Sequence, residues 1–189
     1  MTTSVMTDLL AYNFNIDTTD PSLRHSFMHD LAREGDLLSA EIIFEAGSPI
    51  DSPNDEGRRP IHEAAFFGHL DMVRFFISNG VAIDAPVHPF GHTALYLAVQ
   101  QSHYDIVRYL IKSGARLSVA DSLMGTGLLH IAAAKNDMKM VGILIAAGVN
   151  VFHENRNGMT ARDVAARSNH RMLEKTLLRV MEHHAKYVA

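Results

Sequence analysis

Residues 57–69 read Gly-Arg-Arg-Pro-Ile-His-Glu-Ala-Ala-Phe-Phe-Gly-His, and this stretch decides the fold. Pro60 suits the first turn of a helix, because proline lacks the amide hydrogen that a first turn leaves unbonded. Ile61 and Ala64 follow at helical spacing and begin an apolar stripe. Gly68 predicts the end of this helix, since glycine readily adopts the left-handed conformation that closes many helices. The stretch therefore predicts a short helix with one apolar face.

The same pattern recurs along the chain with a period of 33 or 34 residues. Three ladders of small residues share this period: Gly57, Gly91, Gly125 and Gly158; Gly47, Gly80, Gly114 and Gly148; and Ala64, Ala98, Ala132 and Ala165. At the helix break marked by Gly68, the other units carry Gly35, Ser102, Asn136 and Asn169. Glycine and asparagine suit a left-handed residue, whereas serine suits it less well.

A longer apolar helix is predicted after each break, for example over residues 72–77, 106–111 and 140–145. Each unit thus contains two helices and ends at a glycine. A helix pair this short cannot bury its apolar faces alone, so the units are expected to stack on one another.

Residues 57–69 resemble the signature of the ankyrin repeat family, which has a glycine, a Thr-Pro-Leu-His motif, two alanines and Gly-His. Residues 91–103 and 125–137 repeat the resemblance, with Thr-Ala-Leu-Tyr and Gly-Leu-Leu-His in the four-residue motif. Residues 27–47 resemble a half-degenerate first repeat, and residues 158–182 resemble a last one. About five repeats are expected, at approximately 23–54, 55–88, 89–122, 123–155 and 156–182.

The resemblance implies an all-α solenoid of stacked antiparallel helix pairs, with hairpin loops that project at right angles and a concave side that holds partners. Residues 23–182 are expected to form this single domain. Residues 1–22 are expected to be a flexible segment or one short helix, and residues 183–189 a C-terminal tail. A solvated closing helix fits the last repeat, where Arg and Lys residues alternate with Glu.

Composition excludes several function classes. The formal charge of −4, without a basic run, argues against binding to nucleic acid or to anionic membranes. The chain has no cysteine and no 18-residue apolar run, so we expect neither disulfides nor membrane insertion. These features predict an intracellular, cytoplasmic or nuclear monomer. Export by a route that needs no signal peptide is the alternative.

Twelve histidines raise the question of a metal site. His62 and His130 occupy the position of the family motif where the imidazole is a structural hydrogen-bonding element, and His69 and His103 follow helix breaks. His88 and His92 lie four residues apart in a predicted loop, where this spacing places no two ligands on one face. We therefore expect no metal and no other cofactor. No Gly-rich phosphate loop, nucleophile elbow or His-Glu-x-x-His run occurs, so we expect no catalysis.

Candidate partner-binding residues are those at hairpin tips and at first-helix positions that the family leaves variable. Carried over residue by residue, they are Arg33, Asp55, Arg58, Arg59, Glu63, Phe66, Phe67, Phe90, His92, Leu97, Gln100, Gln101 and Lys135. Phe66, Phe67 and Phe90 are the expected anchors, because exposed aromatic residues in a groove often dominate binding. Two alternatives remain open: one of the adjacent phenylalanines fills a gap between helices, and Arg58 and Arg59 only pair with nearby acidic residues in solvent.

The sequence favours a non-catalytic interaction module that binds one or more proteins through its concave face and hairpins. It would act as an adaptor or a steric inhibitor. Three alternatives fit the same pattern: a bacterial or viral effector that mimics such an adaptor in a host, a regulatory subunit of an enzyme, and a self-associating stack. The partner itself is not encoded in the fold.

Overall fold

The computed structural model describes residues 21–188, which contain ten helices and no strand beyond isolated bridges. The helices are α2 (Pro21–Glu34), α3 (Leu37–Glu45), α4 (Pro60–Phe67), α5 (Leu70–Ser78), α6 (Ala94–Gln101), α7 (Tyr104–Lys112), α8 (Leu128–Ala134), α9 (Met138–Ala146), α10 (Ala161–Arg167) and α11 (Arg171–Val188). They form five consecutive pairs, which we call units 1 to 5. None of these helices is both long enough and apolar enough to cross a membrane.

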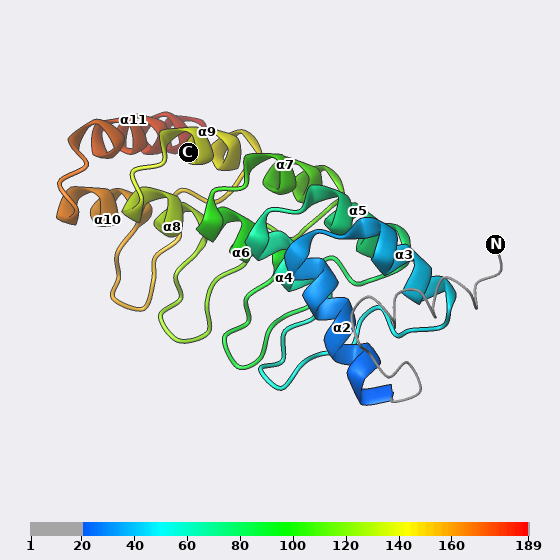
Figure 1. The fold of residues 1–189 in the computed structure, drawn as a ribbon. Coiled ribbons are helices and arrows are strands. Elements are labelled where there is room, and N and C mark those ends of the chain that lie inside the picture. The colour runs from blue at the N-terminus through cyan, green and yellow to red at the C-terminus, as the bar shows by residue number, and fades with distance from the viewer. Residues whose placement is uncertain (1–20, 189) are drawn as a thin grey trace.

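The units stack side by side in two layers, as Figure 1 shows. The first helices (α2, α4, α6, α8 and α10) form one row, and the second helices form the other. Hairpin loops project from the stack beyond the row of first helices. Neighbouring first helices contact each other more extensively than neighbouring second helices, so the stack curves toward the first row. We call the surface of the first helices and the hairpins the concave face. This arrangement confirms the predicted all-α solenoid.

The core repeats with the period of the sequence. The second-helix series Phe76, Leu110 and Leu144 is fully buried, as is the first-helix alanine ladder. The alanines let the first helices approach closely, while the larger side chains fill the space between the two layers. Each large apolar side chain that is removed from water contributes roughly 1.5–3 kcal/mol. The predicted stacking is therefore what buries the apolar faces.

The helix breaks follow the predicted pattern, and this includes Ser102, the residue expected to suit a left-handed conformation least. Gly35, Gly68, Ser102, Asn136 and Asn169 all have positive φ angles, between 55° and 91°. Ser102 adopts φ 62° even though serine disfavours this region, because the stacked units on both sides fix the path of the chain.

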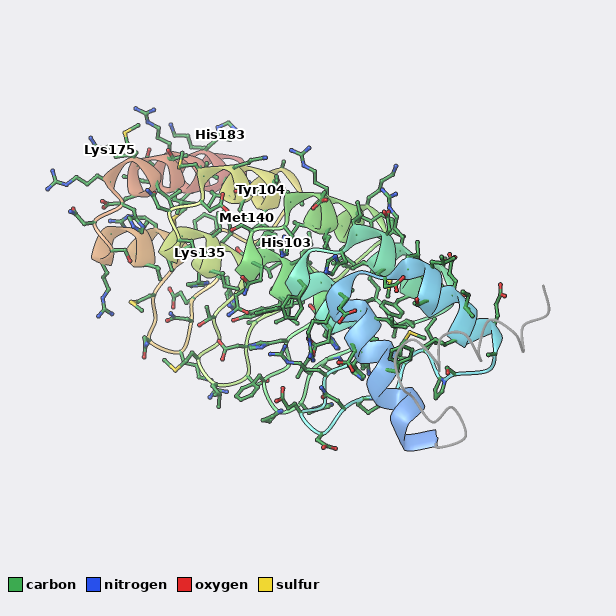
Figure 2. The ribbon with its side chains drawn as sticks, viewed as in Figure 1. His103, Tyr104, Lys135, Met140, Lys175 and His183 are labelled. Atoms are coloured by element: carbon green, nitrogen blue, oxygen red, sulfur yellow. The ribbon has the colours of Figure 1, made fainter. Side chains whose placement is uncertain are left out.

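Histidines after the breaks connect neighbouring units. His103 immediately precedes α7 (Figure 2), and its Nε2 lies 2.9 Å from the Phe66 carbonyl oxygen at the end of α4. His69 makes the equivalent 2.8 Å contact with the Arg33 carbonyl. Each bond satisfies a carbonyl that the end of a helix leaves without an intrahelical partner. The structural roles predicted for His69 and His103 are confirmed.

The motif histidines connect each first helix to the next hairpin. The Nδ1 of His62 accepts a hydrogen bond from the Arg59 amide at 2.9 Å, so its Nε2 carries the proton and donates to the Ala85 carbonyl at 2.8 Å. His130 likewise lies between the Gly127 amide and the Met159 carbonyl. Burial lowers the pKa of His62 to about 4, and it also lowers the pKa of His130. The predicted structural role of both residues is confirmed.

Both ends of the stack differ from the sequence prediction. Helix α11 runs to Val188, so residues 183–188 continue the helix and are not a tail; no proline or glycine interrupts them. Its exposed residues, such as Lys175, project away from the stack (Figure 2). Helix α2 begins at Pro21 and is 14 residues long, against 8 for α4. The short helix proposed within residues 1–22 falls almost entirely outside the described residues.

Replacing Gly68 by alanine should destabilise the fold more than replacing Gly80. Both residues have positive φ, which costs a non-glycine residue roughly 1–2 kcal/mol. A Cβ on Gly68 would lie 2.6 Å from His103 Cε1, whereas a Cβ on Gly80 meets nothing within 4 Å. Displacing His103 breaks its bond to Phe66, so Gly68→Ala should cost about 1 kcal/mol more in urea unfolding. Equal losses of unfolding free energy in the two variants would contradict the proposed role of the His103–Phe66 bond in linking the units.

Stability should fall with pH between about 6.5 and 4 because of His62. Its folded-state pKa, about 4, lies below the ordinary value of 6.5, so the unfolded chain takes up the proton first. The contribution of neutral His62 to stability is therefore fully present above pH 6.5, and it is lost as the pH falls through the folded-state pKa. Over this pH range, the free energy of unfolding of His62→Gln should fall by roughly 3 kcal/mol less than that of the wild type. Unfolding measured at several pH values would show the difference. His88→Gln makes the same substitution at an exposed loop histidine and serves as the control.

Candidate functional site

A groove opens on the concave face between the hairpins of units 1 and 2. Its volume is about 630 Å³, and its walls come from the turn at residues 55–58 and from residues 87–92. Five of the predicted partner-binding residues line it: Asp55, Arg58, Phe90, His92 and Leu97. The structure thus brings together residues that lie up to 42 positions apart in the chain.

Arg58 connects this groove to the aromatic residues of α4. Its guanidinium lies 3.6 Å from a Glu56 carboxylate oxygen, 3.7 Å from a Glu63 carboxylate oxygen and 5.5 Å from the centre of the Phe66 ring. Phe66 in turn meets Phe67 edge to face at 5.1 Å. Phe66 is half-buried and Phe67 is 44% exposed, so the pair forms a continuous aromatic surface beside the groove.

The opposite wall includes the rings of Phe90 and His92, and the buried ring of Tyr96 lies behind them. Phe90 lies 5.6 Å from His92, which lies 4.2 Å from Tyr96 with nearly parallel planes. Burial lowers the pKa of His92, so this imidazole is neutral at pH 7. Burial, together with the negative charge of Asp121, raises the pKa of Tyr96 to about 12. The stack fixes Phe90 at the rim of the groove, where it remains 41% exposed.

Short hydrogen bonds hold the two hairpins in shape. The Asn54 side chain accepts bonds from the Glu56 and Arg58 amides at 3.0 and 2.9 Å. In the second hairpin, the Val87 amide donates to the His92 carbonyl at 2.7 Å. The Ser122 amide of the next hairpin donates to the Phe90 carbonyl at 2.8 Å. The groove walls are therefore built on fixed backbone.

The other predicted residues extend along the concave face away from the groove. Arg33 is exposed and pairs with Asp30 at 3.5 Å within α2. Arg59 bonds to the Asp51 carboxylate at 2.6 Å, so it stabilises the first hairpin. Further along the stack lie Gln100, Gln101 and Lys135, of which Lys135 donates to the Gln100 carbonyl at 2.6 Å.

Two predicted contact residues lie beneath this surface and not on it. Glu63 and Leu97 are each 3% exposed. Both face the neighbouring hairpin, where Glu63 pairs with Arg58 and Leu97 forms part of the groove floor. Sequence reasoning placed them by repeat position alone, which does not show how far a neighbouring hairpin covers each position.

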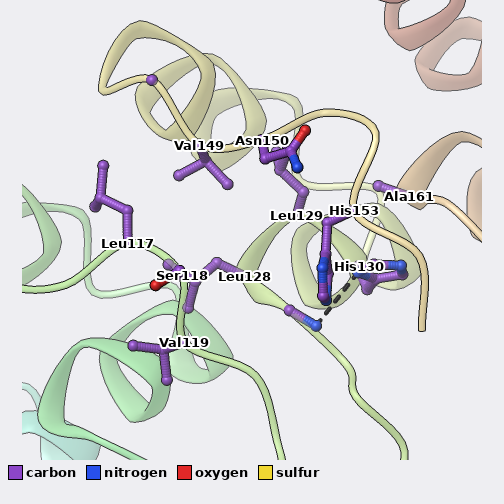
Figure 3. Close-up of a pocket in the computed structure, with 12 residues that line it drawn as sticks. Leu117, Ser118, Val119, Leu128, Leu129, His130, Val149, Asn150, His153 and Ala161 are labelled. Carbon is purple, nitrogen blue, oxygen red and sulfur yellow. Dashed lines mark hydrogen bonds between the residues drawn. The ribbon is translucent and has the colours of Figure 1, made fainter. Parts of the chain in front are cut away.

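Sequence reasoning missed Tyr96 and a second cavity. Tyr96 occupies a motif position that carries histidine in other units, and this departure was its only signal. The second cavity, of about 230 Å³, lies between the hairpins of units 3 and 4 (Figure 3). Leu117, Val119 and Val149 line it, and His153 stands over Gly127, which has no side chain to obstruct it. None of the predicted partner-binding residues lines this cavity.

The groove carries the kinds of side chain that noncovalent binding uses. It combines exposed aromatic rings, two exposed carboxylates and one arginine. Within residues 21–188, no three histidine or acidic side chains are grouped closely enough to hold a metal ion.

Comparison with known families supports the repeat assignment. A family model described as "Ankyrin repeats (3 copies)" matches residues 28–121, and one described as "Ankyrin repeat" matches residues 124–156. Together the two matches run from within α2 to the hairpin after α9 and end before α10.

Several curated proteins share this repeat region. The chain is 35% identical over 102 residues to the nuclear factor NF-kappa-B p105 subunit of Gallus gallus, a match that covers 51% of this chain and 10% of that protein. It is 32% identical over 89 residues to human cyclin-dependent kinase inhibitor 2A, covering 43% and 57%. Alpha-latrotoxin-Lg1a of Latrodectus geometricus is 32% identical over 75 residues, covering 39% and 6%. The chain thus spans less than two thirds of each relative.

Arg58 should be coupled strongly to Glu63 and weakly to Glu56, although the two distances are nearly equal. The Glu63 side chain is 4% exposed, whereas that of Glu56 is 76% exposed. Solvent screens the exposed pair, so its coupling energy should stay below about 0.5 kcal/mol, against about 1–3 kcal/mol for the buried pair. Double-mutant cycles with Arg58→Gln, Glu63→Gln and Glu56→Gln would measure both couplings in urea unfolding. Equal couplings would show that Glu63 does not hold Arg58.

Proposed function

Since the chain belongs to the ankyrin repeat family, we propose that it is a non-catalytic module that binds a partner protein through its concave face and hairpins. The observation that carries this proposal is that three aromatic residues adjoin one groove. Arg58 links Phe66 and Phe67 to the groove, and the stack with His92 holds Phe90 at its rim. Aromatic residues at the centre of an interface commonly contribute most of its binding energy.

The partly exposed state of these rings supports a role in binding. Phe67 and Phe90 are 44% and 41% exposed, while the surrounding side chains hold them in place. Rigid apolar groups lose little conformational freedom on binding, so most of the gain from their burial remains as affinity. A partner that covers both rings would also cover the groove between them.

Binding alone is sufficient for the action that we propose. The module masks the part of a partner's surface that it binds on the concave face. It can also bring a partner whose other surfaces stay free to a further molecule. The name of one relative, cyclin-dependent kinase inhibitor 2A, describes an inhibitor, which favours steric masking for this chain as well.

Removing the exposed rings should abolish capture of the partner without unfolding the chain. Phe66→Ala/Phe67→Ala and wild type would be used as baits in the same lysate, followed by quantitative mass spectrometry. Loss of an anchor aromatic should weaken binding by about 2 kcal/mol or more, which is over tenfold in affinity. A protein recovered by wild type should then be depleted at least tenfold by the double variant.

The control is Phe152→Ala, which removes a ring of the same exposure, 44%, from the hairpin of unit 4. Its capture should match wild type, and urea unfolding should show that all baits are folded. Capture that is unchanged by loss of Phe66 and Phe67 would refute the concave-face site.

A further inference from the structure

The groove between the first two hairpins has an excess of negative charge. Asp55 and Glu56 are exposed at its rim, and the single arginine that lines it, Arg58, is already paired with Glu56 and Glu63. Two carboxylates therefore contact this guanidinium, and the carboxylate of Asp55 adds a further negative charge at the rim. An incoming anion would face these carboxylates, so the local charge favours a cationic group.

The same groove has an apolar and aromatic wall. Val87, Pro89, Phe90 and Leu97 line it, and one side of the Phe90 ring is occupied by its stack with His92. The ring is nevertheless 41% exposed at the rim. The pKa of His92 is lowered by burial, so this neighbour adds no positive charge that would repel a cation at pH 7.

We propose that this groove binds an arginine side chain of the partner, which stacks on Phe90 and pairs with the carboxylates of Asp55 and Glu56. The inference rests on the proposed function and specifies the chemistry of the partner. The occupant is a peptide segment of another protein in which this arginine lies within a short basic, apolar sequence.

Arginine fits the groove better than lysine does. The guanidinium is flat and weakly hydrated, so it stacks on an aromatic ring and still presents a fork of N–H groups to a carboxylate. A lysine ammonium is compact and strongly hydrated, so it gains less from an apolar wall. Arg58 already shows the same combination within this chain, since its guanidinium lies over Phe66 and beside two carboxylates.

The test uses a display library of random 12-residue peptides, selected on the full chain at low salt. Arginine should recur at one position of the enriched peptides, next to an apolar residue. A synthetic peptide from this set, together with its Arg→Lys and Arg→citrulline forms, would then be titrated by fluorescence anisotropy. Citrulline keeps the planar shape without the charge, so it should bind at least about tenfold more weakly, and lysine several-fold more weakly.

Two variants locate the peptide. Asp55→Asn/Glu56→Gln should weaken binding of the arginine peptide by about tenfold and leave the citrulline peptide unchanged. Phe90→Leu, which keeps an apolar side chain but removes the ring, should remove the preference for arginine over lysine. Glu41→Gln/Glu45→Gln removes the same net charge from the exposed surface of α3 and should have no effect.

Each contrary result overturns the inference. No enriched peptide, enrichment without arginine, equal binding of the citrulline form, or equal loss in the Glu41/Glu45 control would each do so. These failures differ from a failure of the proposed function, which is read from capture by the Phe66/Phe67 variant. Selective capture that survives Asp55→Asn/Glu56→Gln would keep the concave-face site and exclude the arginine groove.

Discussion

The dependence of each helix pair on its neighbours governs this structure. Two helices of seven to nine residues, as in units 2 to 4, leave an apolar face that only the next pair can cover, so each unit fixes the position of the unit beside it. Bonds such as that from His103 to Phe66 then set the contact between first helices. Because the hairpins extend from this stack, the distance between two successive hairpins, and hence the width of the groove, is set by helix packing some way beneath it.

This arrangement separates residues that maintain the repeat from residues that are free to bind. Leu97 and Glu63 occupy first-helix positions that the neighbouring hairpin covers, so substitutions there would alter the stack itself. Phe67, Phe90 and Asp55 are exposed, so their side chains can change at little cost to the core. Arg58 joins the two groups, since a buried carboxylate holds it while its guanidinium supports an aromatic ring at the surface.

The same separation explains how far sequence could predict the molecule. The period, the helix breaks and the roles of His62 and His103 follow from local chemistry that recurs along the chain, so they could be predicted from the sequence. The burial of Glu63 and Leu97 depends on the shape of the adjacent hairpin, which the repeat does not specify. The end of α11 was missed because charged residues suit both a solvated helix and a tail. The roles of the site residues in binding remain predictions. They rest on repeat position and on the arrangement of these residues around the groove.

The groove exists where the chain departs from its own repeat. Histidine occupies the motif position in units 1, 2 and 4, and in units 2 and 4 it lies between an amide and a carbonyl. In unit 3 the residue is Tyr96, whose ring instead stacks on His92, and His92 stacks on Phe90. A phenol ring has no pair of nitrogens with which to bond an amide and a carbonyl, so its ring contacts add to the backbone hydrogen bonds of the hairpin. One substitution in the motif thus exchanges a structural bond for an aromatic wall that reaches the surface.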